Sequence, residues 1–208
     1  MTIAVIAIKG DQIDQQNTIF QPFNYIDLKE DITYDNIDGA IKYLFDKYVS
    51  LSERDIALWA QWAIDGWTIF YDPEMVNLLE EDALLALSTT LNTEVFTFII
   101  QSTSSSFGFA KYSTIKERQF MSVDGSITDD LGAPLPEESD LNINEHVFIN
   151  DILNLADKLG IDIQGKKENT YIVKQLGYNE ILKDKLAAYK QTKPQKGQPS
   201  IKPWWKFW

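Results

Sequence analysis

The sequence predicts an α+β protein in which an antiparallel sheet, built as a meander, carries helices packed mainly on one face. An apolar run at residues 3–8 and three alternating segments between residues 95 and 123 predict the sheet. Apolar residues at helical spacing in the flanking segments predict the helices. We expect a single domain over residues 1–190 and a flexible tail over residues 191–208.

The first elements follow from local patterns. Residues 3–8 are apolar at every position, which is typical of a strand covered on both faces. The polar stretch up to Tyr34 shows little periodicity. Residues 36–49 then place apolar side chains on one helical face behind Thr33 and Asp35, two candidate caps, so we expect an amphipathic helix there.

A second helix is predicted over residues 52–66. A variant capping box opens the segment, apolar residues follow at helical spacing, and Gly66 ends it. Trp59, Trp62 and Trp67 gather around its end. Large aromatic residues beside an apolar stripe are more often part of a core than of a pocket, and we favour the core.

The meander occupies the middle of the chain. Residues 67–71 predict a short strand, and Asp72-Pro73 predicts the start of a helix over residues 73–91. Three strands follow at residues 95–101, 107–112 and 118–123. Asp124-Gly125 is a strong two-residue hairpin signal before a further strand at residues 126–128.

The remaining elements are mostly helical. Residues 129–144 read as a loop, and apolar residues between Phe148 and Leu159 predict a helix closed by Gly160. Residues 170–173 suggest an edge strand. Apolar spacing over residues 178–189 predicts a last amphipathic helix.

The net charge of −12 conceals an asymmetry. Residues 1–165 hold 9 Lys and Arg against 28 Asp and Glu, whereas residues 166–208 hold 10 against 3. An acidic body repels phosphate backbones, so we expect no nucleic-acid partner. Solubility alone or a basic protein partner would each account for the charge.

The acids are densest around the predicted hairpin and the loop that follows. We expect an acidic surface formed by Asp124, Asp129, Asp130, Glu137, Glu138 and Asp140. Their spacing matches no calcium loop, so a patch for a basic partner is favoured over a metal site. We expect no cofactor.

Few catalytic arrangements are open to this chain. It has no cysteine and one histidine, which excludes thiolate chemistry and multi-histidine metal sites. His146 would serve as a general base beside Glu145 or Asp140, but an ordinary position at a helix start is favoured. A hydrolase using carboxylates between residues 124 and 146 is the third hypothesis, behind two non-catalytic ones.

The tail is the segment whose composition suggests contact with another surface. It is rich in lysine and proline, holds no acid after Lys190, and ends in Trp204, Trp205, Lys206, Phe207 and Trp208. Tryptophan with lysine suits a membrane interface or a groove on a partner, and docking on the body of the same chain is a further alternative. No secretory signal and no apolar run of membrane-spanning length is evident, so we expect a cytoplasmic protein.

Three short segments carry a resemblance. Residues 66–68 (GWT), 131–138 (LGAPLPEE) and 159–162 (LGID) give a layout that resembles small uncharacterised acidic bacterial α+β proteins, some of which look like immunity proteins that neutralise toxins. The resemblance covers about half the chain and brings no catalytic residues. It implies a bacterial cytoplasmic binding protein.

These observations together predict a non-catalytic protein. We expect it to engage a macromolecular partner through its acidic surface, in an immunity-like or accessory role. The alternative is a peripheral membrane protein tethered by the tail.

Overall fold

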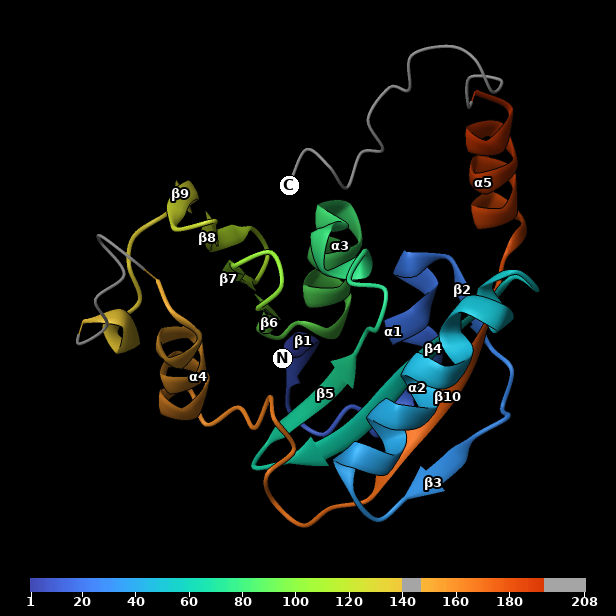
Figure 1. The fold of residues 1–208 in the computed structure, drawn as a ribbon, viewed down its shortest axis with the longest axis horizontal. Coiled ribbons are helices and arrows are strands. Elements are labelled where there is room, and N and C mark those ends of the chain that lie inside the picture. Colours follow the sequence, from blue (N-terminus) through green and yellow to red (C-terminus); the bar gives the residue numbers. More distant parts are fainter. Residues whose placement is uncertain (140–146, 193–208) are drawn as a thin grey trace.

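A computed structural model of the chain describes residues 1–139 and 147–192. In this part of the chain, ten strands form one antiparallel sheet that is flanked by five α-helices (Figure 1). The strands are β1 (Thr2–Lys9), β2 (Tyr25–Asp27), β3 (Ile32–Tyr34), β4 (Ile56–Ile64), β5 (Trp67–Tyr71), β6 (Val95–Gln101), β7 (Ser106–Tyr112), β8 (Lys116–Val123), β9 (Ser126–Leu131) and β10 (Tyr171–Tyr178). The α-helices are α1 (Gln16–Phe20), α2 (Ile37–Ser52), α3 (Glu81–Leu91), α4 (Ile149–Lys158) and α5 (Glu180–Thr192). Short 3-10 helices are η1 (Ile13–Gln15), η2 (Gln21–Phe23), η3 (Asn77–Leu79) and η4 (Pro136–Glu138).

The strand order is β2-β10-β4-β5-β1-β6-β7-β8-β9. β3 also pairs with β10, along its first residues, while β2 pairs with its last. Every pairing is antiparallel. The predicted α+β class with an antiparallel sheet is therefore confirmed, and the meander is its second half, β6 to β9.

The helices cover both faces of the sheet. Alternate residues of β1 belong to two separate core clusters, with Val5 in one and Ile6 in the other. We call the side that carries α2 and α4 the α4 face, and the side that carries α1, α3 and α5 the α3 face. This corrects the expectation of helices mainly on one face: strands that are apolar at successive positions need cover on both sides.

The predicted helix over residues 52–66 is wrong, because this segment forms β4. α2 runs on to Ser52, and Asp55 in the turn that follows has a left-handed φ of 59°. β4 lies inside the sheet between β10 and β5. Its alternation sends Trp59 to the core of the α3 face and Trp62 to the core of the α4 face, each 1% exposed. The tryptophans are therefore core residues, as favoured.

β10 is also different from its prediction. It extends to Tyr178 and lies inside the sheet, between β4 on one side and β2 and β3 on the other, instead of forming an edge. Its central Lys174 is fully buried and ion-paired with Asp27 and Asp31. α1, β2 and β3 were not predicted, because each is five residues or shorter and carries no visible period.

The other predictions hold with adjusted ends. The hairpin turn at Asp124-Gly125 is confirmed, and both residues have positive φ. The cap of α2 is Asn36, whose side chain accepts the Gly39 N–H, in place of the predicted Thr33 or Asp35. α4 ends before Gly160 as predicted. The helix predicted over residues 73–91 is shorter: a turn and η3 precede α3. None of the helices in the described ranges is both long and apolar enough to cross a membrane.

Candidate binding groove

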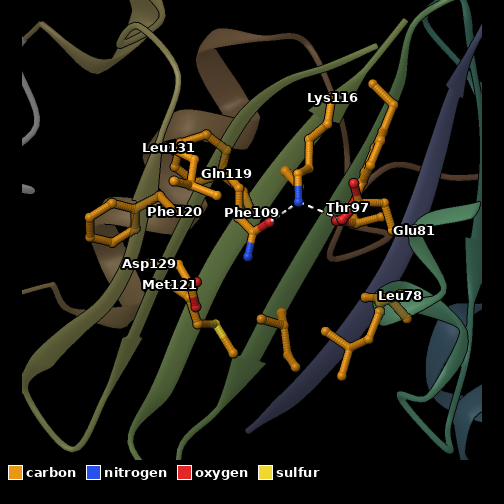
Figure 2. A pocket seen from close by; sticks show the side chains of 14 residues that line it. Leu78, Glu81, Thr97, Phe109, Lys116, Gln119, Phe120, Met121, Asp129 and Leu131 are labelled. Atoms are coloured by element: carbon orange, nitrogen blue, oxygen red, sulfur yellow. Dashed lines mark hydrogen bonds and ion pairs between the residues drawn. The ribbon is translucent and has the colours of Figure 1, made fainter. Parts of the chain in front are cut away.

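A hollow lies on the α3 face over the strands β6–β9 (Figure 2). Its volume is about 230 Å³. η3 and the start of α3 form one side, and β9 forms the other. The side chains that line it include Leu78, Leu79, Glu81, Thr97, Ile99, Ala110, Lys116, Gln119, Met121, Asp129 and Leu131.

Strand register explains why these residues meet. One row across the sheet is Thr97, Ala110, Gln119 and Leu131, and the next is Ile99, Gly108, Met121 and Asp129. Paired residues of antiparallel strands point to the same face, so both rows form the floor of the hollow. The floor is thus assembled from four strands.

The floor is lowest along β7, where Gly108 and Ala110 carry little or no side chain. Met121 of β8 lies across Gly108: a Cβ built on Gly108 would be 2.5 Å from the Met121 Sδ and 2.6 Å from the Phe120 carbonyl oxygen. A glycine is required where a side chain and a strand approach so closely. The missing side chain leaves room for Met121, whose side chain forms this part of the floor.

A second hollow of about 710 Å³ continues the first. Both are lined by Leu79, Ile99 and Met121. The second one extends to Glu74, in the turn before η3, and to the serines around the β6–β7 loop. We call the two hollows together the groove.

Acidic side chains stand around the groove. Glu81, at the start of α3, lines the groove, and its chain neighbours Glu80 and Asp82 are exposed; Asp129 lines the groove on β9, and Glu74 lines its far end. We call these five residues the acidic rim. Lys116 also lines the groove, and its ammonium contacts Glu81 Oε2 at 2.5 Å and Gln119 Oε1 at 2.7 Å, as Figure 2 shows. Its charge is offset by Glu81, so the rim stays negative overall.

The turn that carries Glu74 is held by a buried carboxylate. Asp72, 1% exposed, accepts hydrogen bonds from the Glu74 N–H at 3.0 Å and from the Asn77 N–H and Nδ2 at 3.0 and 2.9 Å. Burial raises the pKa of Glu74, and the neighbouring Asp72 raises it further, to about 7. Glu74 therefore changes charge near neutral pH.

We expect the substitution Glu74→Gln to stabilise the protein above pH 7. The folded protein keeps the Glu74 proton up to a pKa of about 7, whereas the ordinary value is 4.5. The free energy of unfolding therefore falls as the pH rises from 4.5 to about 7, and the loss is complete above pH 7. The variant, with no proton to lose, should be more stable by about 1–2 kcal/mol at pH 8, after allowance for partial exposure.

Urea denaturation at pH 4 and at pH 8 measures this difference. The gain should vanish at pH 4, where Glu74 is protonated in both states. An equal effect of the substitution at the two pH values would mean that Glu74 titrates normally.

The structure separates the five described members of the six acids predicted to form one surface. Asp129 faces the groove, while the adjacent Asp130 points to the α4 face and binds Arg118 at 2.5 Å. Glu138 is 7% exposed and also binds Arg118. Asp124 is exposed in the β8–β9 turn, and Glu137 is half-buried in η4. Asp140 lies outside the described residues.

Arg118 is a structural residue that the sequence did not single out. Its guanidinium is 2% exposed and donates to both Glu138 carboxylate oxygens, at 2.9 and 2.8 Å. The same group lies 5.7 Å from the centre of the Phe109 ring and 5.9 Å from that of Phe120. Twenty positions separate Arg118 from Glu138, so no local pattern reveals the pair.

Two other predicted features lie outside the described residues: His146, and the tail with Trp204, Trp205, Lys206, Phe207 and Trp208. Within residues 1–139 and 147–192, no three His, Asp or Glu side chains come together as metal ligands would. The groove itself had one sequence signal, the mixed apolar and acidic composition of β9.

Comparisons with known proteins add no family to this geometry. No protein-family model matches the chain, and neither does any curated protein or solved structure that was searched. The groove must therefore be interpreted from its own chemistry.

Proposed function

We propose that this protein binds another protein without catalysing a reaction, in an immunity-like or accessory role in the cytoplasm, and that the groove is its binding surface. The single observation that carries the proposal is the groove itself: an apolar floor that no described residue covers, bordered by the acidic rim. The groove replaces the wider acidic surface expected from the sequence as the place of contact.

Exposed apolar side chains support a binding role. Leu79 is 43% exposed and Leu131 is 51% exposed, on opposite sides of the same floor. Contiguous apolar surface with a polar border is typical of interaction sites. The span from β6 to β9 is three strand spacings, or about 14 Å, which accommodates one helix or one extended segment.

The acidic rim defines the chemistry of the partner. Asp129 lines one side of the floor, and Glu81, paired with Lys116, lines the other, next to the exposed Glu80 and Asp82. Carboxylates in this position attract Lys and Arg and repel phosphate groups. The expected partner segment therefore has apolar side chains at its centre and basic residues at its flanks, and nucleic acid is disfavoured.

The acids around η4 support binding over hydrolysis. Asp130 and Glu138 are both engaged by Arg118, and Asp129 points to the other face. A carboxyl pair for acid–base catalysis must face a common substrate space. Among the described residues, Asp130 and Glu138 neutralise Arg118 instead of facing a substrate space, and Asp129 faces away from them.

Site-specific photo-crosslinking tests the proposal. The photoreactive residue p-benzoylphenylalanine is placed at Leu131, which faces the groove, or at Ile127, which is 39% exposed on the opposite face of β9. Cells that make the protein are then illuminated. We expect a discrete protein conjugate from position 131 and none from position 127. Equal conjugates from both positions, or none from position 131, would contradict the proposal.

A further inference from the structure

We propose that the tail of the same chain, residues 193–208, binds in the groove and acts as an internal competitor of the partner. This inference rests on the function proposed for the groove. The inferred ligand of the groove is a basic and aromatic segment of the same chain.

The tail has the chemistry that the groove selects. Residues 193–208 contain four lysines and no acid. Trp204, Trp205, Phe207 and Trp208 add a dense aromatic group. Tryptophan is the side chain that contributes most when it fills an apolar pocket in an interface, and neighbouring lysines match a negative border.

The groove offers both complementary features. Its apolar floor is exposed at Leu79 and Leu131, and its border holds carboxylates at Asp129, at Glu74 and at Glu81, the last of which is paired with Lys116. The volume of the two hollows is large enough for more than one aromatic side chain. The tail alone would be enough to cover the apolar floor of the groove.

The tail starts on the correct side of the sheet. α5, which leads into it, packs Leu182 and Leu186 against the core of the α3 face, the face that carries the groove. Figure 1 shows α5 beyond the end of β10. The tail therefore reaches the groove without crossing the sheet.

The tail is also long enough. β10 and β8 are six strand spacings apart, or about 29 Å. Even if α5, about 20 Å long, projects at a right angle to that direction, its end lies about 35 Å from β8. Eleven residues lie between Thr192 and Trp204, and the twelve steps along the chain would span about 37 Å in a polyproline conformation.

Covalent linkage makes this occupant hard to displace. Linkage to the same chain gives the tail an effective concentration on the order of millimolar at the groove. A partner with the same chemistry must compete with it. The tail then lowers the apparent affinity for the partner and favours tighter or more basic partners over weak ones.

A spin label on the full chain tests the proposal. The chain has no cysteine, so Ser200→Cys gives a single labelling site within the tail. Paramagnetic broadening of backbone amide signals is then measured by NMR. We expect loss of signal for residues 119–121 and 129–131 of β8 and β9, and retained signal for residues 171–173 of β10. Broadening only near α5 and β10, with β8 and β9 unaffected, would overturn the proposal.

Matched variants show whether the contact uses the groove. The double substitution Leu79→Ser/Leu131→Ser removes exposed apolar side chains from the groove, and should restore the β8 and β9 signals. The control Ile115→Ser/Ile127→Ser removes exposed apolar side chains elsewhere and should leave the broadening intact. Equal broadening in both variants would also overturn the proposal.

Vesicles of phosphatidylserine and phosphatidylcholine provide the competing outcome. If β8 and β9 are unaffected by the label while the full chain sediments with these vesicles in a salt-sensitive way, the tail is a membrane anchor and not a groove ligand. Failure of the tail proposal stays separable from failure of the groove: crosslinking from position 131 to a partner would continue in the first case and disappear in the second.

Discussion

Replacing Arg118 with methionine should lower the free energy of unfolding by about 3–5 kcal/mol, measured by urea denaturation at pH 7. The substitution removes the cation that neutralises the Glu138 carboxylate, and Glu138 is only 7% exposed. It also removes the hydrogen bond from Arg118 Nη1 to the Leu131 carbonyl oxygen at 3.0 Å. A buried charge without its partner carries the full cost of desolvation.

The same contacts connect stability to the groove. Arg118 joins β8 to the end of β9 and to η4, and β9 carries the groove residues Asp129 and Leu131. Gly132, with a φ of 82°, lets the chain turn tightly against β8 directly after β9. We therefore expect the Arg118 variant to lose partner binding along with stability.

Two variants control for this interpretation. Asp130→Asn removes only the exposed arm of the network, since the Asp130 side chain is 56% exposed, and should cost less than about 1 kcal/mol. Arg118→Met/Glu138→Met removes both buried charges and should recover much of the loss. An Arg118→Met variant as stable as the parent would show that the Arg118–Glu138 pair adds nothing to the fold.

Replacing Lys174 with alanine should lower the free energy of unfolding by about 2–4 kcal/mol at pH 7. The Lys174 ammonium is buried and contacts Asp27 at 3.0 Å, Asp31 at 2.7 Å and Gln16 Oε1 at 2.8 Å. The Asp27 side chain has no exposed surface, and after the substitution only Lys29, at 2.7 Å, remains to balance it. Lys29 makes the expected loss smaller than for Arg118.

The pH dependence of this loss follows from Asp27. Burial by itself raises the pKa of Asp27, but hydrogen bonds from Lys29 and Lys174 hold it below its ordinary value. Stability from the charged carboxylate is thus present at neutral pH and is lost as the pH falls below about 4. The difference in free energy of unfolding between the Lys174→Ala variant and the parent should therefore become smaller in acid. Lys29→Ala, at an exposed position, should cost less than about 1 kcal/mol.

Local signals predicted the parts of the fold that local chemistry decides. β1 shows no polar position over residues 3–8, and the structure buries it on both faces. Asp124-Gly125 has the turn chemistry of a two-residue hairpin and forms one. Gly160 closes α4 with a φ of 73°. In each case one short segment contains the whole cause.

The error at β4 shows where such signals conflict. Asp65-Gly66 has the same turn signature as Asp124-Gly125, and both of its residues have positive φ in a hairpin that joins β4 to β5. Apolar residues at positions 56, 59, 60 and 63 also fit a helix face, which led to Gly66 being read as a helix stop. Burial on both faces of the sheet decided the outcome, and this is a tertiary effect.

The groove depends still more on tertiary structure. Its floor joins residues of β6, β7, β8 and β9 through their register, and its side is η3, which precedes these strands. The sequence predicted Asp129 and Asp130 as members of one acidic surface. The two side chains lie on opposite faces because both residues belong to β9, which extends to Leu131. The burial of Lys174 could not be predicted either, because its partners Asp27 and Asp31 lie in a segment without periodicity.

The affinity of the partner found by crosslinking, measured with two matched variants, tests the groove most directly. For Leu79→Ser/Leu131→Ser we predict a loss of at least about tenfold in affinity, since each buried leucine contributes about 1.5–3 kcal/mol. For Ile115→Ser/Ile127→Ser we predict an affinity equal to that of the parent protein. Equal losses in the two variants, or a loss only in the second, would contradict the assignment of binding to the groove.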